Sequence, residues 1–224
     1  MRGGELLESV RIPGEGAKLC LYKMDGEFAI WVENTELMNS LAHESEDALA
    51  DLGCAGLKDA PASAVLIGGL GMGFTLAAAL KRVGPGARVV VGELMSAVVI
   101  WNRGVLGHLA GNPLDDPRVT VQEGDVARIL QTEENAFDAI LLDVDNGPTG
   151  LVRDTNNWLY SEEGLYAAYT ALRVNGVLAV WSSAPDRAFM MRLQKMGFAA
   201  EEHRIPVQPE FKDGHDTIWT ARRL

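Results

Sequence analysis

SAVLIGGLGMGFT, from Ser63 to Thr75, joins a short apolar run to a glycine-rich turn and the start of a helix-like segment. This order is typical of the strand, turn and helix of a nucleotide-binding fold. Glycine has no Cβ, so such a turn can adopt positive φ and let a ligand approach its backbone, while the next helix presents free N–H groups. We therefore expect a nucleotide site at Gly68, Gly69, Gly71 and Gly73, although a plain tight connection would show the same residues.

Beyond this stretch, apolar runs alternate with helix-like segments. The sequence predicts strands at 87–92, 119–122, 137–142 and 176–181, and helices at 96–109, 126–131, 161–172 and 185–196. Two longer strand-like runs, 199–207 and 216–222, end the chain. The predicted fold class is α/β: a doubly wound, Rossmann-like, mostly parallel sheet with an antiparallel C-terminal hairpin.

The segment before the glycine turn has a different pattern. Residues 19–32 predict two short strands around Asp25-Gly26, a dipeptide suited to a tight hairpin turn. Leucines at helical spacing predict an amphipathic helix over 36–57. We expect residues 1–57 to form an N-terminal β-hairpin and connecting helix, and residues 58–224 to form the Rossmann-like, nucleoside-binding catalytic domain.

The overall charge narrows the classes of partner. With 20 basic and 31 acidic residues, the net charge of -11 argues against nucleic acid and is compatible with a cationic small substrate. No apolar run approaches the ~20 residues of a membrane span, and the N-terminus does not resemble a signal peptide. We expect a cytoplasmic protein without membrane contact. Cys20 and Cys54 lack metal-site spacing and are expected to be buried.

Three acids follow directly after predicted strands. Ligands of doubly wound sheets bind beyond the carboxyl ends of the strands, where Glu93, Asp125 and Asp143 lie in the sequence. Glu93 comes 20 residues after Gly73, where an acid can accept hydrogen bonds from ribose hydroxyls. Each acid could instead cap a helix, and for Asp125 that alternative is equally favoured.

These features resemble the spermidine synthase family, a branch of the class I S-adenosylmethionine-dependent transferase fold, over nearly the whole chain. The matching segments are the N-terminal hairpin, GGLGMG, VVVGEL, DDPRVTVQEGDV, and FDAILLD with the Gly-Pro loop after it. The resemblance implies that Gly69, Gly71 and Gly73 pass close to a sulfonium nucleoside. It also implies that Glu93 holds the ribose and that Asp125 accepts the adenine amino group.

By the same resemblance, Asp143 is the acid that helps to deprotonate the attacking amine. Asp145 or Asn146 would replace the second acid of the family's loop, which is two residues longer. The co-substrate would be S-adenosylmethionine or its decarboxylated form, without a metal. The acceptor would be a small molecule such as a polyamine, and the protein would be a homodimer that uses the hairpins at the two ends of the sheet.

The chain departs from the family pattern at the amine-binding half of the site. Gly71 stands where the family has an Asp that holds the amino end of decarboxylated S-adenosylmethionine. The family's Tyr-His pair is replaced by Met38-Asn39-Ser40 and His43-Glu44. Three functions therefore stay open: aminopropyl transfer, methyl transfer from S-adenosylmethionine to a small molecule, and nucleoside binding without catalysis.

A metal-dependent O-methyltransferase is disfavoured because only serines follow the fifth predicted strand. Trp158 and Tyr160 are expected to form a lid or cation-binding wall over the site, and for Trp158 core packing is an equally favoured alternative. Asn102 and Arg103 are predicted near a helix end, on a surface that could reach a neighbouring subunit. His108 is assigned to the same surface, and His215 to a structural or interface role.

Overall fold

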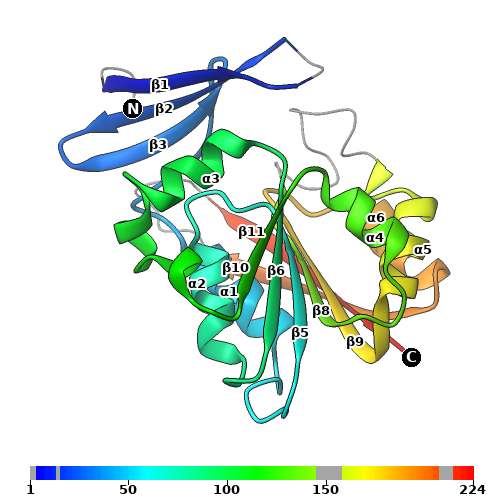
Figure 1. Cartoon of the computed structure of the whole chain (residues 1–224). Helices are drawn as coiled ribbons and strands as arrows, with labels where there is room; N and C mark the ends of the chain where they lie inside the picture. Colours follow the sequence, from blue (N-terminus) through cyan, green and yellow to red (C-terminus); the bar gives the residue numbers. More distant parts are fainter. Residues whose placement is uncertain (1–3, 14–15, 145–157, 207–213) are drawn as a thin grey trace.

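Two β-sheets organise the chain in the computed structural model, which describes residues 4–13, 16–144, 158–206 and 214–224 (Figure 1). The first is an antiparallel sheet in which the four N-terminal strands pair in chain order. Its strands are β1 (Glu5–Arg11), β2 (Lys18–Met24), β3 (Glu27–Val32) and β4 (Thr35–Asn39).

The predicted hairpin at 19–32 is confirmed as β2 and β3. Asp25 and Gly26, both at positive φ, make its turn. Two further strands extend it, and they form a separate sheet rather than an edge of the main one. The prediction that this hairpin would offer a dimer edge at one end of the main sheet is therefore wrong.

The predicted helix at 36–57 is wrong over its first part. Residues 35–39 form β4, in which Met38 pairs with Ile30 of β3, and α1 (Glu44–Gly53) begins only later. Glu33, at φ 50°, makes a second tight turn, which brings the chain back beside β3 before a helix can start. The proposed division of the chain after residue 57 stays a prediction.

The second sheet is seven-stranded, in the order β10-β11-β9-β8-β5-β6-β7. Strands β5 to β9 pair in parallel, and β11 pairs antiparallel with both β9 and β10, which confirms the predicted fold class and terminal hairpin. Its strands are β5 (Ala64–Gly68), β6 (Arg88–Glu93), β7 (Val119–Glu123), β8 (Phe137–Leu142), β9 (Leu172–Ser182), β10 (Phe198–Pro206) and β11 (His215–Arg223).

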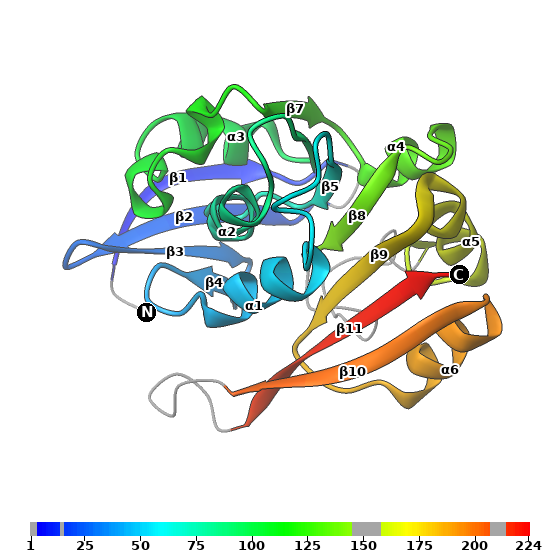
Figure 2. The same cartoon turned by 90° about the horizontal axis from the view of Figure 1, so that it is seen from below.

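Helices cover both faces of this sheet, and each face has its own apolar core (Figures 1 and 2). The other helices are α2 (Phe74–Arg82), α3 (Ser96–Arg103), α4 (Val126–Thr132), α5 (Glu162–Ala171) and α6 (Arg187–Lys195). Helices α1 to α3 and the N-terminal sheet pack on one core, and α4 to α6 on the other. The N-terminal sheet thus lies on the same side as the glycine turn between β5 and α2.

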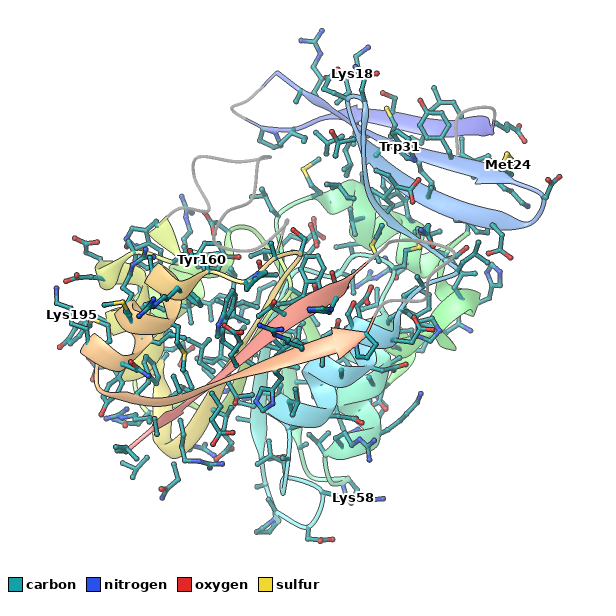
Figure 3. All side chains as sticks on the ribbon, turned by 180° about the vertical axis from the view of Figure 1, so that it is seen from behind. Lys18, Met24, Trp31, Lys58, Tyr160 and Lys195 are labelled. Carbon is teal, nitrogen blue, oxygen red and sulfur yellow. The ribbon has the colours of Figure 1, made fainter. Side chains whose placement is uncertain are left out.

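Helix α3 is shorter than the predicted 96–109 because the chain leaves helical geometry at Gly104, and a 3₁₀ turn (Gly107–Ala110) follows. Tyr160 lies in the α5 and α6 layer (Figure 3), is 3% exposed and packs edge-on against Phe189. Trp158 is half-buried against the same core. The predicted lid role is thus wrong for Tyr160, which packs in the core. Among the described residues, no helix is both long and apolar enough to cross a lipid bilayer.

Candidate active site

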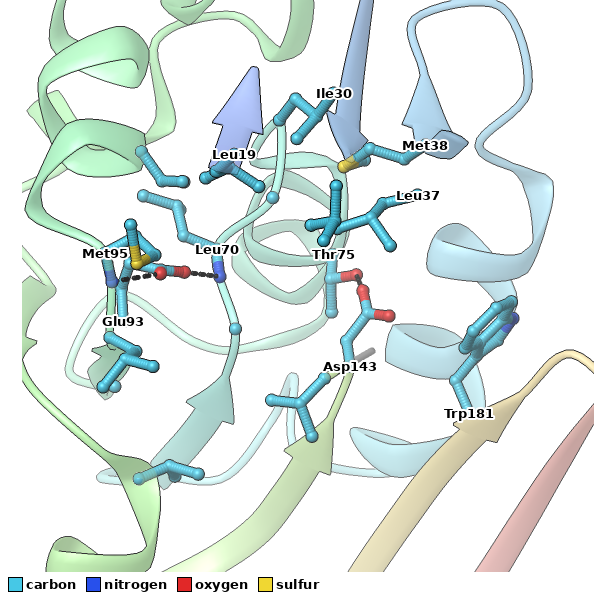
Figure 4. A pocket seen from close by; sticks show the side chains of 18 of the residues that line it. Leu19, Ile30, Leu37, Met38, Leu70, Thr75, Glu93, Met95, Asp143 and Trp181 are labelled. Carbon is cyan, nitrogen blue, oxygen red and sulfur yellow. Dashed lines mark hydrogen bonds between the residues drawn. The ribbon is translucent and has the colours of Figure 1, made fainter. Parts of the chain in front are cut away.

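A cavity of about 200 Å³ lies at the carboxyl ends of β5, β6 and β8, beneath the N-terminal sheet (Figure 4). Adjacent parallel strands place their ends at one edge, so residues distant in sequence meet there. Glu93 and Leu70 lie on one side of the cavity, and Thr75, Asp143 and Trp181 lie on the other.

The glycine turn forms the floor between these two sides. Gly69, Gly71 and Gly73 have φ values of 89°, 51° and 84°, a region that residues with a Cβ rarely adopt. Gly69 and Gly71 line the cavity, whereas Gly68 ends β5 and Gly73 is the N-cap of α2. At Gly69 a Cβ would lie 2.3 Å from the backbone oxygen of Asp143, so only glycine fits there.

Glu93 ends β6 and holds the turn. It is 7% exposed, its Oε2 accepts a 2.8 Å hydrogen bond from the Leu70 amide, and its Oε1 accepts a 2.7 Å bond from the Met95 amide. Both carboxylate oxygens are thereby fixed in direction while the side chain lines the cavity.

Asp125 is both a helix cap and a lining residue. Its Oδ1 accepts a 2.9 Å hydrogen bond from the Ala127 amide at the start of α4, so the N-cap alternative is correct. It also lines the cavity, between Gly124 and Val126. A cap and a ligand contact use different lone pairs, so the two roles are compatible.

Asp143 follows β8 and lines the opposite side of the cavity. Its Oδ2 accepts a 2.6 Å hydrogen bond from the Thr75 hydroxyl. Burial raises the pKa of Asp143, the Thr75 hydrogen bond opposes that rise, and the negative charge of Asp216 adds to it. Asp145 and Asn146, the candidates for a second loop acid, lie outside the described residues.

Glu46 is a lining residue that the sequence interpretation missed. It belongs to the first turn of α1. Burial raises its pKa to about 8, and the charges of Asp143 and Asp216 contribute further to the rise. Asp216, on β11, is 8% exposed. The charge of Asp216 therefore acts on both Glu46 and Asp143 at this end of the cavity.

The roof of the cavity is apolar and comes from the N-terminal sheet. Met38 packs on the glycine turn, since a Cβ placed on Gly71 would lie 2.8 Å from the Met38 sulfur. The other side chains of this roof are Ile12, Leu19, Ile30, Val32 and Leu37. The position that carries an acid in the resembled family is therefore closed from above by a thioether.

The remaining candidates do not themselves line the cavity. Asn102 is 2% exposed, so its predicted surface position is wrong. The His108 ring packs edge-on against Phe28, and His43 stacks on Phe74, with its Nδ1 3.0 Å from Asp47. His215 begins β11 and is exposed.

In the described part of the chain, no three His, Cys, Asp or Glu side chains are grouped so as to hold a metal ion.

Comparison with known proteins gives consistent matches. Residues 46–191 match the model of the spermine/spermidine synthase domain. A polyamine aminopropyltransferase from Thermoanaerobacter pseudethanolicus is 29% identical over 126 residues, which are 56% of this chain and 42% of that protein. The chain thus spans less than half the length of the curated relative that it matches.

Solved structures show the same fold. A spermidine synthase from Thermotoga maritima has a TM-score of 0.77 at 21% identity, covering 98% of this chain and 73% of the other. A spermidine synthase in complex with the transition state analogue AdoDATO has a TM-score of 0.78 at 20% identity, covering 98% and 74%. A probable spermidine synthase from Corynebacterium glutamicum has a TM-score of 0.65 at 13% identity, covering 98% and 80%.

Proposed function

We propose, because this chain belongs to the spermine/spermidine synthase family, that it transfers an aminopropyl group from decarboxylated S-adenosylmethionine to a small amine. One observation carries the proposal: a single cavity joins a glycine turn and Glu93 to Glu46 and Asp143. The first pair suits a nucleoside and the second suits a cation. The names of the related aminopropyltransferase and spermidine synthases support the same reaction.

The donor would lie along the glycine turn. The backbone of Gly69 and Gly71 allows close approach, and the Glu93 carboxylate, held by two amides, has a fixed direction toward ribose hydroxyls. Asp125 lies farther along the same side, where it would accept the adenine amino group. These contacts bind and orient the donor without reacting with it.

The acceptor would lie between Asp143 and Glu46. A protonated amine has no free lone pair, so it must lose a proton before it attacks. Asp143 would take that proton, while the Thr75 hydrogen bond keeps its other oxygen in place. The nitrogen then bonds to the carbon beside the sulfonium. The carbon–sulfur bond breaks with its electron pair on sulfur, which leaves neutral 5′-methylthioadenosine. Asp145 remains a proposed second acid.

Methyl transfer is the second candidate, and the contact between Gly71 and Met38 favours it. The turn carries no acid that would select an ammonium or repel a carboxylate at this position. Free amides of a turn tolerate the carboxylate of S-adenosylmethionine. The acids Glu46 and Asp143 oppose this candidate, because they make the other end of the cavity negative.

Product analysis by mass spectrometry separates the candidates. The protein is incubated with each donor in turn, together with a panel of di- and polyamines. We expect 5′-methylthioadenosine from the decarboxylated donor. S-adenosylhomocysteine from S-adenosylmethionine would instead establish methyl transfer. Nucleoside binding without either product would leave a binding protein.

The variant Asp143→Asn is the internal control for this assay. A transferase should lose turnover and keep its nucleoside affinity, because the substitution removes the base and leaves the turn intact. A binding protein should change in neither respect.

We also propose that the protein is a cytoplasmic homodimer. The family resemblance supports the dimer, and β10 and β7 are the edge strands of the main sheet as described. Light scattering after size-exclusion chromatography measures the mass directly, and a mass of 24.2 kDa at micromolar concentration would refute the dimer.

A further inference from the structure

Asn102 is a buried polar side chain that contacts the glycine turn from behind. It belongs to α3 and is 2% exposed. Its Nδ2 donates a 2.8 Å hydrogen bond to the backbone oxygen of Gly71 and a 2.9 Å bond to that of Val98. The side-chain amide of Asn102 therefore links the glycine turn to α3.

The unit formed by β6 and α3 holds the glycine turn at a second point. Glu93, at the end of β6, accepts from the Leu70 amide, and Asn102, on the helix that follows, donates to Gly71. Two consecutive residues of the turn are thus held through opposite groups, an N–H and a C=O. A turn with three glycines has many accessible conformations, and two such anchors restrict them.

The oxygen of the Asn102 side-chain amide indicates why an asparagine occupies this position. Its Oδ1 is buried and has no hydrogen-bond partner among the described residues. A Cβ placed on Gly73 would lie 3.0 Å from this oxygen, so it faces the backbone of the turn. A buried acceptor without a partner costs free energy. Packing alone would favour an apolar residue, so the donor nitrogen accounts for the asparagine.

We propose that Asn102 is a positioning residue that holds the glycine turn in its nucleoside-binding conformation through the Gly71 carbonyl. The inference rests on the proposed function only in taking the turn as the nucleoside site. Asn102 does not line the cavity. It acts through Gly71, which does, and preorganisation of this kind improves affinity without adding a ligand contact.

The variant Asn102→Asp provides a test that depends on pH. Above its pKa the new carboxylate has no hydrogen to donate and faces two carbonyl oxygens; below its pKa, the acid has one O–H to donate. Burial raises the pKa of a carboxyl group, so the protonated form is accessible at mild acidity. We expect the Kd of 5′-methylthioadenosine to rise roughly tenfold at pH 8 and to return to within about threefold of wild type at pH 5.5.

Amide hydrogen exchange of the 69–75 segment is the second readout, measured as a ratio to wild type at each pH. Exchange in Asn102→Asp should be faster at pH 8 and near wild type at pH 5.5. Asn102→Leu, which has no donor, should exchange faster at both pH values. Asn135→Asp, whose oxygen accepts from Arg223, is the matched control and should match wild type.

The outcomes are distinguishable. Wild-type protein that does not bind the nucleoside would refute the proposed function, and the exchange ratios would still decide the role of Asn102. Equal loss at both pH values in Asn102→Asp would refute the positioning role. So would unchanged exchange in Asn102→Leu.

Discussion

Replacing Glu46 by Gln should stabilise the protein at pH 8.5 and have little effect at pH 5. Burial raises the pKa of Glu46 from 4.5 to about 8, and the charge of Asp143 adds to the rise. Between pH 4.5 and about pH 8, the folded protein keeps the Glu46 proton and the unfolded chain does not. The stability that this proton provides is fully present below about pH 4.5 and is lost as the pH rises through about 8.

The size of the effect follows from the pKa. One pKa unit corresponds to about 1.4 kcal/mol, so the rise in the Glu46 pKa sets an upper limit of about 5 kcal/mol on the loss. Glu46 is only partly buried and borders a cavity that water can enter. Screening therefore reduces the effect, and we expect the Gln variant to be about 1 to 3 kcal/mol more stable at pH 8.5.

Urea unfolding of wild type and Glu46→Gln at pH 5, 6, 7, 8 and 8.5 measures this difference. Glu44→Gln is the matched control because it removes a carboxylate from the same first turn of α1 at an exposed position. Above the Glu46 pKa of about 8, loss of a favourable helix-dipole interaction is then common to both variants. If the free-energy difference between wild type and Glu46→Gln stays constant over this pH range, Glu46 is ionised throughout and the reasoning is wrong.

Three further predictions test other parts of the site and core. Asp143→Asn should lower turnover by about 10² to 10⁴. Thr75→Ala removes a hydrogen bond that lowers the Asp143 pKa, so the pH at which the rate rises should be higher in this variant than in wild type. An unchanged pH–rate profile in Thr75→Ala would exclude Asp143 as the base. Gly69→Ala should cost at least about 2 kcal/mol more in urea unfolding than Gly56→Ala, because both have positive φ but only Gly69 has a backbone oxygen in the way; equal costs would contradict this. Cys54, whose pKa burial and the charge of Asp51 raise to about 12, should be alkylated in the native protein at pH 8 roughly a thousandfold more slowly than an ordinary thiol; rapid native labelling would contradict burial.

The sequence was sufficient for the main sheet but not for the N-terminal one. Strands β5, β6 and β8 contain unbroken apolar runs, such as Val89–Val91 and Ala139–Leu142, because both faces of the sheet are covered there, and that pattern has few other interpretations. Strand β1 is exposed along most of its length and has no apolar alternation to reveal it. In β4, Leu37 lies at helical spacing from the later leucines, so periodicity favoured a helix where pairing with β3 decided for a strand.

The glycines and strand-end acids of the cavity were also more predictable than the acids on α1 and β11. Glycines and strand-end acids are positioned by local rules, and Gly69, Glu93 and Asp143, which the sequence indicated as site residues, all line the cavity. Glu46 has no such mark, because it is one of several acids in an acidic helix. Asp216 reaches the acids only because β11 inserts between β9 and β10, a pairing that no local pattern indicates.

The acids at the proposed acceptor end connect stability to the proposed function. Burial and the charges of Asp143 and Asp216 raise the pKa of Glu46, and burial and the charge of Asp216 raise that of Asp143; a bound ammonium would oppose both shifts by stabilising the charged forms. Amine binding should therefore release protons at neutral pH, and it should strengthen as the pH rises toward 8, since an alkyl amine with a pKa near ~10 stays protonated there. Calorimetry in buffers of different ionisation enthalpy measures this release.

Because Glu46→Gln removes the exchangeable proton, the variant should release fewer protons and bind the amine more weakly while being more stable at alkaline pH. A variant that is more stable but binds the amine with unchanged affinity and proton release would show that Glu46 does not contact the acceptor, whatever its pKa.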